Sequence, residues 1–418
     1  MKLISLLKSR KMLALLMLGF ASGLPAAQAD GLLPLWLKDQ QFADKDLTPI
    51  LGLAGIPIAF KFLWAPLIDR YIPPFLGRRR GWLMITQVTL LILLSLLALQ
   101  HPDSKSVDFF KALVLLIGFV GATQDIAGDA YRTESLPNKA EKGAGGALWT
   151  NGFRISYLLA GSLLVLLVKP LTWNGVYFLV AGMMLIGIAA SWFAPEPTYN
   201  EKSPASFADA VTLPFKEFFS RKDMKVIDSI AILAFILVYK LGDNLARIGG
   251  KLYFKKLGFT NEVIGSQTAI ATISAIVGAL FGAWIILKVG LNRALWIGIL
   301  LLAVGISPYI LMVNNGTASL PLLALSVNAE YFFGGTEAAV FVAFLMNLCN
   351  SRFTATQYAL FSGIVFFGKS VVVWYSGAVI EAVGYHNFFW LCIASTIPGL
   401  LLLAYIAPWS KPDTDLAA

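Results

Sequence analysis

Twelve runs of mainly apolar residues follow one another along this chain, each about 20 residues long or longer. A helix of that length crosses the roughly 30 Å of hydrocarbon in a bilayer. The composition agrees, because 57% of the residues are hydrophobic and only 14% are charged. The alternation of apolar and polar residues that marks barrel strands does not occur. The chain is therefore predicted to be an all-α membrane protein. The predicted spans lie near residues 12–36, 47–68, 82–100, 108–131, 146–168, 172–194, 226–247, 261–287, 292–313, 317–349, 354–380 and 386–407.

The longest polar interval divides the twelve spans into six and six. It includes the stretch PEPTYNEKSPASF and a basic segment that follows it. Such an interval between two hydrophobic halves is typical of an interdomain linker. We predict an N-terminal six-helix half at 1–194, a linker at 195–225 and a C-terminal six-helix half at 226–418.

The distribution of Lys and Arg predicts the orientation of the chain. An even number of spans places both termini on one side, and most of the 33 basic residues fall on that side. The positive-inside rule then predicts cytoplasmic termini. The loop after the seventh span runs against this pattern, because Lys251, Lys255 and Lys256 would face outward. The net charge of +9 is explained mainly by contacts with anionic membrane lipids, and no nucleic-acid partner is predicted.

No cofactor, metal site or enzyme activity is predicted. The two cysteines, Cys349 and Cys392, lie near helix ends or within apolar runs, and His101 and His386 each stand alone. The chain lacks a phosphate-cradling glycine loop and metal-ligand spacing. Residues 2–29 mimic a secretory signal, but the eleven spans that follow predict an uncleaved first helix.

Ionisable residues inside the predicted spans follow a repeating pattern. Away from the span ends, carboxylates occur only in the first, fourth, seventh and tenth spans, whereas every third span contains no ionisable residue. A charge at bilayer depth costs about 2.5 to 3.5 kcal/mol on insertion scales, so it faces protein or a water-filled cavity. The pattern predicts repeated three-helix units, with two six-helix halves around a central cavity. The ionisable residues away from the span ends are Asp30, Lys61, Asp125, Asp129, Arg154, Lys240, Asp243, Glu330, Glu337 and Lys369.

The loop after the second span, WAPLIDRYIPPFLGRRRGWL at 64–83, resembles the signature loop of the major facilitator superfamily. A weaker match to the same motif, LKVGLNRALW, lies in the second half of the chain at 287–296. The resemblance implies a twelve-helix bundle in which the charges of this loop pair with helix ends and hold one gate shut. The alternative for the three consecutive arginines is that they only obey the positive-inside rule. The predicted gating residues are Asp69, Arg70, Arg78, Arg79, Arg80 and Arg132.

Several longer stretches carry a closer resemblance, to the AmpG family of muropeptide permeases. They are GFASGLP at 19–25, FKFLWAPLIDRYIPPFLGRRRGWL at 60–83, QDIAGDAYRTESLP at 124–137, APEP at 194–197, YKLGD at 239–243 and LMNLCNSRFTATQYAL at 345–360. The resemblance implies proton-driven import of an anionic glycopeptide, an anhydro-muropeptide, across the bacterial inner membrane by a monomer. Related permeases carry siderophores or acetyl-CoA, so another anionic solute is the alternative cargo.

Asp125 and Asp129 lie one helical turn apart and project from one face. Two like charges at this spacing favour uptake of a proton by one of them. We predict that Asp125 takes part in proton coupling and that Asp129 supports the gate. The alternative is a static ion pair with Arg154, which is also the first choice for binding a substrate carboxylate.

Lys240 and Asp243 are close enough in sequence to neutralise one another in a purely structural pair. In the functional alternative, a substrate carboxylate or phosphate competes for Lys240 and frees Asp243 to take up a proton. Glu330 precedes the pair Gly334 and Gly335, which predicts close helix approach or local bending.

The complete set of candidate residues has two parts. The predicted proton-coupling residues are Asp30, Asp125, Asp129, Asp243, Glu330 and Glu337. The predicted substrate-binding residues are Gln124, Arg154, Lys240, Lys61, Lys369, Tyr239 and Trp36. The two aromatic residues are included because they could stack on sugar rings, and packing or interfacial anchoring is their alternative role.

Overall fold

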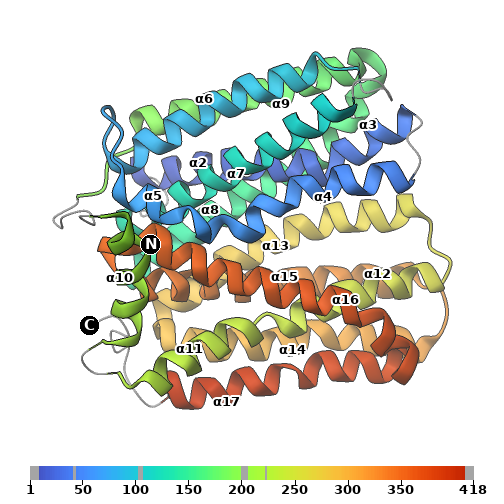
Figure 1. Ribbon diagram of the computed structural model, residues 1–418. Helices are drawn as coiled ribbons and strands as arrows, with labels where there is room; N and C mark the ends of the chain where they lie inside the picture. The colour runs from blue at the N-terminus through green and yellow to red at the C-terminus, as the bar shows by residue number, and fades with distance from the viewer. Residues whose placement is uncertain (1–8, 41–43, 102–106, 199–205, 222–223, 410–418) are drawn as a thin grey trace. The chain divides into compact units, whose positions relative to one another are not determined.

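The computed structural model describes residues 9–40, 44–101, 107–198, 206–221 and 224–409 (Figure 1). These residues form helices and loops, and no strand occurs among them. The helices before the linker are α2 (Arg10–Ala27), η1 (Gln28–Leu32), α3 (Leu33–Asp39), α4 (Asp44–Phe60), η2 (Lys61–Leu63), α5 (Ala65–Arg70), α6 (Arg78–Ala98), α7 (Val107–Ser135), α8 (Lys139–Gly161), η3 (Leu163–Leu167) and α9 (Val168–Phe193). Those that follow are α10 (Phe207–Phe219), α11 (Val226–Val238), α12 (Leu241–Lys256), α13 (Asn261–Val289), α14 (Leu291–Asn315), α15 (Leu320–Leu348), η4 (Ser351–Phe353), α16 (Thr354–Ala394) and α17 (Thr396–Ile406).

Eight helical stretches in the described part of the chain have the length and apolar character needed to cross a membrane. One of them, Glu141–Phe193, covers two of the predicted spans. The predicted spans at 47–68 and 226–247 are not among the eight, and of the predicted span at 354–380 only the end is included, in Tyr375–Ile406. The spans at 47–68 and 226–247 are interrupted, and each contains a lysine, buried Lys61 or half-buried Lys240, which lowers the hydropathy of any continuous helical window.

Several predicted spans contain a break in the α-helix, among them the fifth at η3 and the twelfth between α16 and α17. Three further breaks carry candidate residues. The first span changes to the π-helix η1, the second to the 3₁₀-helix η2, and the seventh is interrupted between α11 and α12. Such segments place backbone groups outside the regular ladder of hydrogen bonds and are frequent at functional sites. The three breaks carry Asp30, Lys61 and Lys240. Three of the interrupted helices therefore have a candidate residue at the break, whereas the breaks in the fifth and twelfth spans have none.

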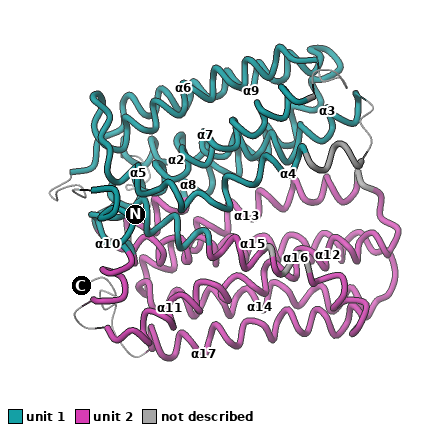
Figure 2. Tube along the Cα trace, viewed as in Figure 1, with its two compact units in different colours: residues 1–137, 148–214, 349–363 teal, residues 138–147, 215–348, 364–418 magenta. Residues whose placement is uncertain are grey.

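The chain divides into two compact units (Figure 2). Unit 1 comprises residues 1–137, 148–214 and 349–363, and unit 2 comprises residues 138–147, 215–348 and 364–418. The beginning of α8 thus belongs to unit 2, and the beginning of α16 belongs to unit 1. These two short segments differ from the predicted division into 1–194 and 226–418. Their assignment depends on tertiary packing, which a linear pattern of hydropathy does not report.

In unit 1, small residues allow α2 and α8 to approach closely. A Cβ atom on Gly152 would lie 2.1 Å from the carbonyl oxygen of Leu16, and one on Gly23 would lie 2.0 Å from Ser156 Oγ. Small residues are the usual means of packing helices within a membrane. This packing fixes α2 beside the elements that carry the first set of buried charges.

In unit 2, α13 and α15 pack in the same way. A Cβ atom on Gly335 would lie 2.3 Å from the carbonyl oxygen of Ala275, and one on Gly278 would lie 1.9 Å from that of Phe332. Thr336 Oγ1 also donates a hydrogen bond of 3.0 Å to the carbonyl oxygen of Gly278. Gly335 therefore serves the close approach of two helices.

Candidate functional site

Lys61, Asp125, Asp129 and Arg132 form a buried network in unit 1, here called cluster 1. Lys61 Nζ contacts Asp125 Oδ2 and lies 3.2 Å from Asp129 Oδ2. Arg132 Nη2 lies 2.7 Å from Asp129 Oδ1, and Ser22 Oγ donates a 3.2 Å hydrogen bond to Asp125 Oδ1. All four carboxylate oxygens therefore have a donor, and two cations balance two carboxylates. The partner that the structure sets against Asp125 is Lys61.

Arg132 extends cluster 1 to the beginning of α16. Its guanidinium donates a hydrogen bond to the Tyr358 hydroxyl and lies over the Tyr358 ring, 4.8 Å from the centroid. It also lies 5.3 Å from the centroid of the Trp149 ring. Because Arg132 is nearly fully buried, these aromatic contacts take the place of solvent around its charge. The predicted gating residue thus connects Asp129 to the segment of α16 that belongs to unit 1.

Lys240, Asp243, Arg247, Glu330 and Glu337 form a second network in unit 2, here called cluster 2. Lys240 Nζ contacts Glu337 Oε2 and lies 2.8 Å from Asp243 Oδ2. Arg247 Nη2 lies 3.0 Å from Asp243 Oδ1 and 2.9 Å from Glu330 Oε1. Two cations therefore face three carboxylates, and two of these carboxylates converge on one nitrogen atom.

Glu337 is the least satisfied member of cluster 2. Its side chain is 0% exposed, and within the described residues Glu337 Oε1 has no hydrogen-bond partner. Glu330 Oε1 also has no hydrogen-bond partner among these residues, but it lies 2.9 Å from Arg247 Nη2, and Glu330 Oε2 accepts a 3.1 Å hydrogen bond from the Tyr309 hydroxyl. A buried carboxylate oxygen without a donor is costly unless the group carries a proton or meets a ligand. Glu337 is therefore the group in cluster 2 best prepared to accept a proton.

Arg247 was not among the predicted site residues. It lies at the end of the predicted seventh span, where the sequence places a loop, but α12 continues to Lys256. The spacing of four residues from Asp243 is the signal that indicates a contact on one helical face. Gly334 adds a second feature that the sequence did not reveal, because a Cβ atom there would lie 2.8 Å from Asp243 Oδ1. The absence of a side chain makes room for this carboxylate.

Gln124 and Gln28 are two of the buried amide side chains of unit 1. Gln124 is 1% exposed, and neither its Oε1 nor its Nε2 has a hydrogen-bond partner among the described residues. Gln28 Nε2 donates a 3.0 Å hydrogen bond to the carbonyl oxygen of Pro25, while its Oε1 has no such partner in the same part of the chain. An unsatisfied buried polar group costs about 1 to 3 kcal/mol. Gln124 in particular is suited to hydrogen bonding with a polar ligand or with water.

Asp69 forms hydrogen bonds to the beginning of α16 within unit 1. Asp69 Oδ2 accepts hydrogen bonds of 2.8 Å from both the backbone nitrogen and Oγ1 of Thr356, and Oδ1 accepts one of 3.2 Å from the backbone nitrogen of Ala355. Arg79 Nη2 and Arg78 Nη2 lie 2.8 and 3.2 Å from Asp69 Oδ1. A carboxylate at a helix N-terminus satisfies backbone N–H groups that have no partner within the helix. Asp69 therefore binds a helix end and two arginines at once.

The remaining arginines of this loop have different contacts. Arg79 also forms a paired contact with Glu134, with distances of 2.9 Å from Nε and 2.6 Å from Nη2. Arg80 donates to the carbonyl oxygens of Ser191 and Trp192 at 2.8 and 2.5 Å, at the end of α9. Arg70 lies 5.5 Å from the centroid of the Tyr71 ring. Arg78 and Arg79 therefore contact Asp69, whereas Arg80 contacts the end of α9.

The other predicted residues lie outside the two clusters. Asp30 is exposed and accepts a 2.7 Å hydrogen bond from the Tyr157 hydroxyl. Arg154 is half-buried on α8, and Lys369 is exposed on α16. The position of Asp30 in η1 gives its carboxylate access to solvent or ligand.

The two aromatic candidates have their rings in the protein core. Trp36 is 2% exposed, and its ring lies 4.6 Å from that of Tyr177 and 5.6 Å from that of Phe110. Tyr239 is 1% exposed and stacks on Phe341 at 4.7 Å. Core packing occupies both rings, so we do not include them in the site assigned below.

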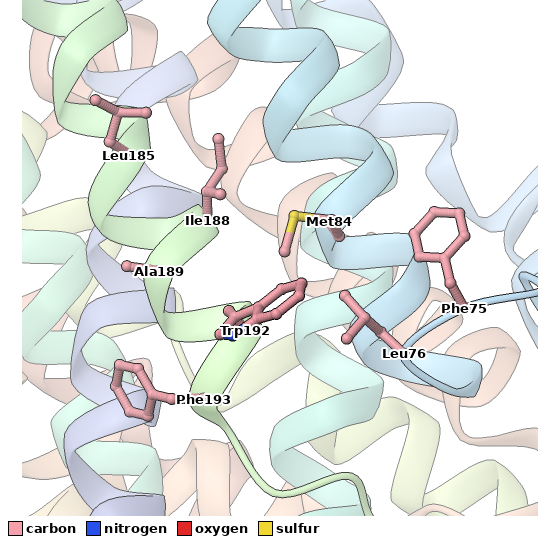
Figure 3. A pocket seen from close by; sticks show the side chains of 8 residues that line it. All are labelled: Phe75, Leu76, Met84, Leu185, Ile188, Ala189, Trp192 and Phe193. Atoms are coloured by element: carbon pink, nitrogen blue, oxygen red, sulfur yellow. The ribbon is translucent and has the colours of Figure 1, made fainter.

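A cavity of about 910 Å³ lies on unit 1 beside α6 and α9 (Figure 3). The side chains from α9 face Met84 of α6 and two residues of the preceding loop across it. The lining residues are Phe75, Leu76, Met84, Leu185, Ile188, Ala189, Trp192 and Phe193. This lining is apolar and contains no group that would recognise a charged ligand. The candidate site is therefore assigned to the charge clusters and not to this cavity.

The chain is similar in sequence to known permeases and transporters. The family model of the Major Facilitator Superfamily matches residues 12–242. A protein of Haemophilus influenzae is 39% identical, with 98% of this chain and 97% of that protein covered. The anhydromuropeptide permease of Escherichia coli K12 is 38% identical, with 93% of this chain and 78% of the permease covered.

Two solved structures share the fold. The proton:xylose symporter XylE has a TM-score of 0.67 at 14% sequence identity, with 97% of this chain and 96% of the symporter covered. The human organic anion transporter MFSD10 has a TM-score of 0.69 at 19% identity, with 94% of this chain and 99% of the transporter covered. These likenesses confirm the predicted all-α membrane fold of twelve helices in two six-helix halves.

Proposed function

The chain belongs to the Major Facilitator Superfamily, and from this premise we propose that it imports an anhydro-muropeptide by proton-coupled alternating access. It is a multi-pass transporter of the inner membrane and not an enzyme, as its relatives are named permeases and transporters. The observation that supports this choice of substrate is the 38% identity to an anhydromuropeptide permease over 93% of the chain. These relatives do not favour the alternative of a siderophore or an acyl-CoA-like compound.

We propose that both termini lie in the cytoplasm, as the positive-inside rule predicts. Asp69 and the beginning of α16 are then at the cytoplasmic end of unit 1. Asp69 accepts three hydrogen bonds from the beginning of α16, which supports a role in holding this end closed. Release of this segment from Asp69, and of Tyr358 from Arg132, would accompany opening. We expect a monomer that contacts membrane lipids over its apolar surface.

We propose that the proton binds in cluster 2. A buried carboxylate without a counter-ion is strongly unfavourable, and cluster 2 has three carboxylates for two cations. One bound proton removes this imbalance. Glu337 is the preferred acceptor because its Oε1 has no hydrogen-bond donor among the described residues. Lys251 is the next cation along α12, but it is exposed and forms no ion pair in the described part of the chain, so solvent screens its charge.

Competition for Lys240 provides a way to couple the proton to the substrate. Lys240 Nζ is shared by Glu337 and Asp243, so a substrate carboxylate that contacts it would weaken both existing pairs. The released carboxylate would then bind a proton more readily. Two ligands that affect one shared group in this manner must influence each other's affinity reciprocally. This supports the functional role of Lys240 over a purely structural pair.

In unit 1, we propose that Gln124 binds a polar group of the substrate, such as a sugar hydroxyl or an amide. Both atoms of its amide lack a partner among the described residues, and it precedes Asp125, the most exposed carboxylate of cluster 1. Lys61 holds Asp125 and Asp129 together, so this cluster is complete without a ligand or a proton. We therefore assign cluster 1 to linking this region with Arg132 and Tyr358.

Uptake into proteoliposomes with an imposed pH gradient, acidic outside, tests the proposal. We expect accumulation of a labelled anhydro-disaccharide tripeptide, and we expect a protonophore to abolish it. Uptake of a ferric siderophore in place of the muropeptide would overturn the substrate assignment. Muropeptide accumulation that is unaffected by the protonophore would overturn the proton coupling.

A further inference from the structure

A row of cations extends along α12 from cluster 2 towards the end of the helix. Arg247, Lys251 and Lys255 follow one another at intervals of four residues, which makes them neighbours on the helix surface. Lys251 and Lys255 are exposed, and the side chain of Arg247 is 33% exposed. The row therefore begins at a buried carboxylate network and ends at an accessible surface.

The packing of α12 fixes which side of the helix remains accessible. A Cβ atom on Gly249 would lie 2.2 Å from the Phe388 ring, and one on Gly250 would lie 2.6 Å from the Tyr309 ring. Tyr253 and Phe254 are buried in the same core. Because these residues hold one side of α12 against the core of unit 2, the cations are presented away from it.

Lys369 of α16 adds a further positive charge to this surface. It lies within electrostatic range of Lys251, which in turn lies within range of Arg247 and Glu330. Within the described residues, neither Lys251 nor Lys369 forms an ion pair with a carboxylate. Glu330 is already held by Arg247 and Tyr309. Two helices thus bring three cations together, and two of them have no counter-ion of their own.

We propose that Arg247, Lys251 and Lys369 form an anion-binding site in unit 2 that receives a carboxylate from the peptide part of the substrate. This inference rests on the proposed transport of a muropeptide and names the residues that bind its peptide part. Like charges gathered from two helices repel one another, so an anion bound among them is stabilised by each. Charge-assisted hydrogen bonds to a carboxylate supply both affinity and orientation.

The site also explains why the positive-inside rule fails for this loop. In the proposed orientation, the end of α12 faces the periplasm, where topology does not require lysine. Cations at the mouth of a binding site raise the local concentration of an anionic ligand and speed its arrival. Lys251 and Lys255 then serve capture of the substrate on the side from which it comes.

Arg247 connects the anion to the proton-binding cluster. Its Nη2 atom is shared by Asp243 and Glu330, and its side chain is partly accessible. A substrate carboxylate that binds Arg247 would compete with these two carboxylates. The acid that loses its partner then gains affinity for a proton. Anion binding at the surface of α12 is thereby coupled to protonation within cluster 2.

The test uses two ligands that differ only in the peptide: an anhydro-disaccharide tripeptide and the same anhydro-disaccharide without peptide. Uptake is measured with the full-length double variant Lys251→Gln/Lys369→Gln in vesicles of zwitterionic lipid. We expect KM for the tripeptide to rise about tenfold or more, because charge-assisted contacts are lost. KM for the peptide-free ligand should change much less. Added salt should weaken tripeptide uptake by the wild type more than by the variant.

Lys256→Gln provides the matched control. It removes the same charge from the same helix, but Lys256 lies over the Tyr385 ring at 5.0 Å and outside the row. We expect wild-type KM values for both ligands, and we expect Lys251→Arg to retain most of the tripeptide affinity.

Three outcomes would overturn the assignment. An equal change in KM for both ligands, or no change in the double variant, would overturn the anion site while leaving muropeptide transport in place. An effect of the double variant that appears only in vesicles with anionic lipid would assign the cations to a lipid headgroup instead. A folded wild type that transports neither ligand would overturn the proposed function and this inference with it.

Discussion

Cluster 1 and cluster 2 share a lysine at an interrupted helix, but they differ in their balance of charge. Lys61 begins η2 and contacts two carboxylates of α7, whereas Lys240 precedes α12 and contacts one carboxylate of α12 and one of α15. Each cluster has one arginine as its second cation. Cluster 1 contains two carboxylates and cluster 2 contains three. The difference of one acidic group leaves the charges of cluster 1 balanced and gives cluster 2 one carboxylate more than it has cations, which is why we propose that cluster 2 binds the proton.

The hydrogen bonds lead to the same distinction. In cluster 1, Ser22, Lys61 and Arg132 provide a donor for every carboxylate oxygen. In cluster 2, Glu337 Oε1 has none among the described residues. Burial favours neutral assemblies, so the two clusters respond differently to the loss of a single charge. Substitutions that alter one charge at a time therefore test the comparison directly.

The largest effect is expected for Glu337→Gln. Glutamine imitates the protonated acid permanently, so cluster 2 is neutral without a proton and can no longer cycle. We expect accumulation of muropeptide against its gradient to be abolished, while exchange between equal concentrations continues. Both are measured with the same proteoliposomes. Asp125→Asn is the counterpart in cluster 1, and the comparison fails if it abolishes accumulation while Glu337→Gln does not.

Removal of Lys61 should mainly affect stability. Lys61→Met leaves two buried carboxylates with a single arginine, and breaking a buried pair in this manner costs about 3 to 5 kcal/mol. We expect a lower unfolding temperature in detergent. The double variant Lys61→Met/Asp125→Asn restores the balance and should recover much of the loss. A double variant less stable than the single one would show that charge balance does not hold cluster 1 together.

The contrast between the clusters was only partly accessible from sequence. The cost of placing Lys61, Asp125, Lys240 or Glu337 in an apolar run was enough to predict that each has a partner or a function. The choice of partner was not, because residues more than 60 positions apart meet only in the folded chain. Arg247 was missed because it lies where hydropathy ends the seventh span, although α12 continues beyond it.

The fold was predictable to a similar degree. Apolar runs of the length of a membrane crossing predicted the order of the helices, whereas the breaks at Asp30, Lys61 and Lys240 have no distinct hydropathy signal. The attachment of α16 to Asp69 was also beyond reach, because Ala355 and Thr356 bind through backbone nitrogen atoms. Every residue other than proline has the same backbone N–H group, so a contact through that group cannot be predicted from the residue type.

Gly334→Ala sharpens the comparison without changing any charge. The added Cβ atom would lie 2.8 Å from Asp243 Oδ1 and would displace this carboxylate from Lys240 or Arg247. We expect proton-driven uptake to fall about tenfold, equivalent to about 1.4 kcal/mol. Gly265→Ala is the control, because nothing lies within 4 Å of its added atom. Equal uptake by both variants would show that the position of Asp243 is not critical.

The smallest effect is expected for Gln124→Ala, which removes a hydrogen-bonding group next to cluster 1 and leaves both clusters' charges unchanged. The loss of one neutral hydrogen bond to the substrate costs about 0.5 to 1.5 kcal/mol, which raises KM roughly two- to tenfold. Because no proton site is altered, the pH at which uptake is half-maximal should remain that of the wild type. The measurement is KM for the tripeptide at several external pH values. A shift of the pH profile without a change in KM would mean that Gln124 acts through Asp125, and cluster 1 would then take part in proton binding despite its balanced charges.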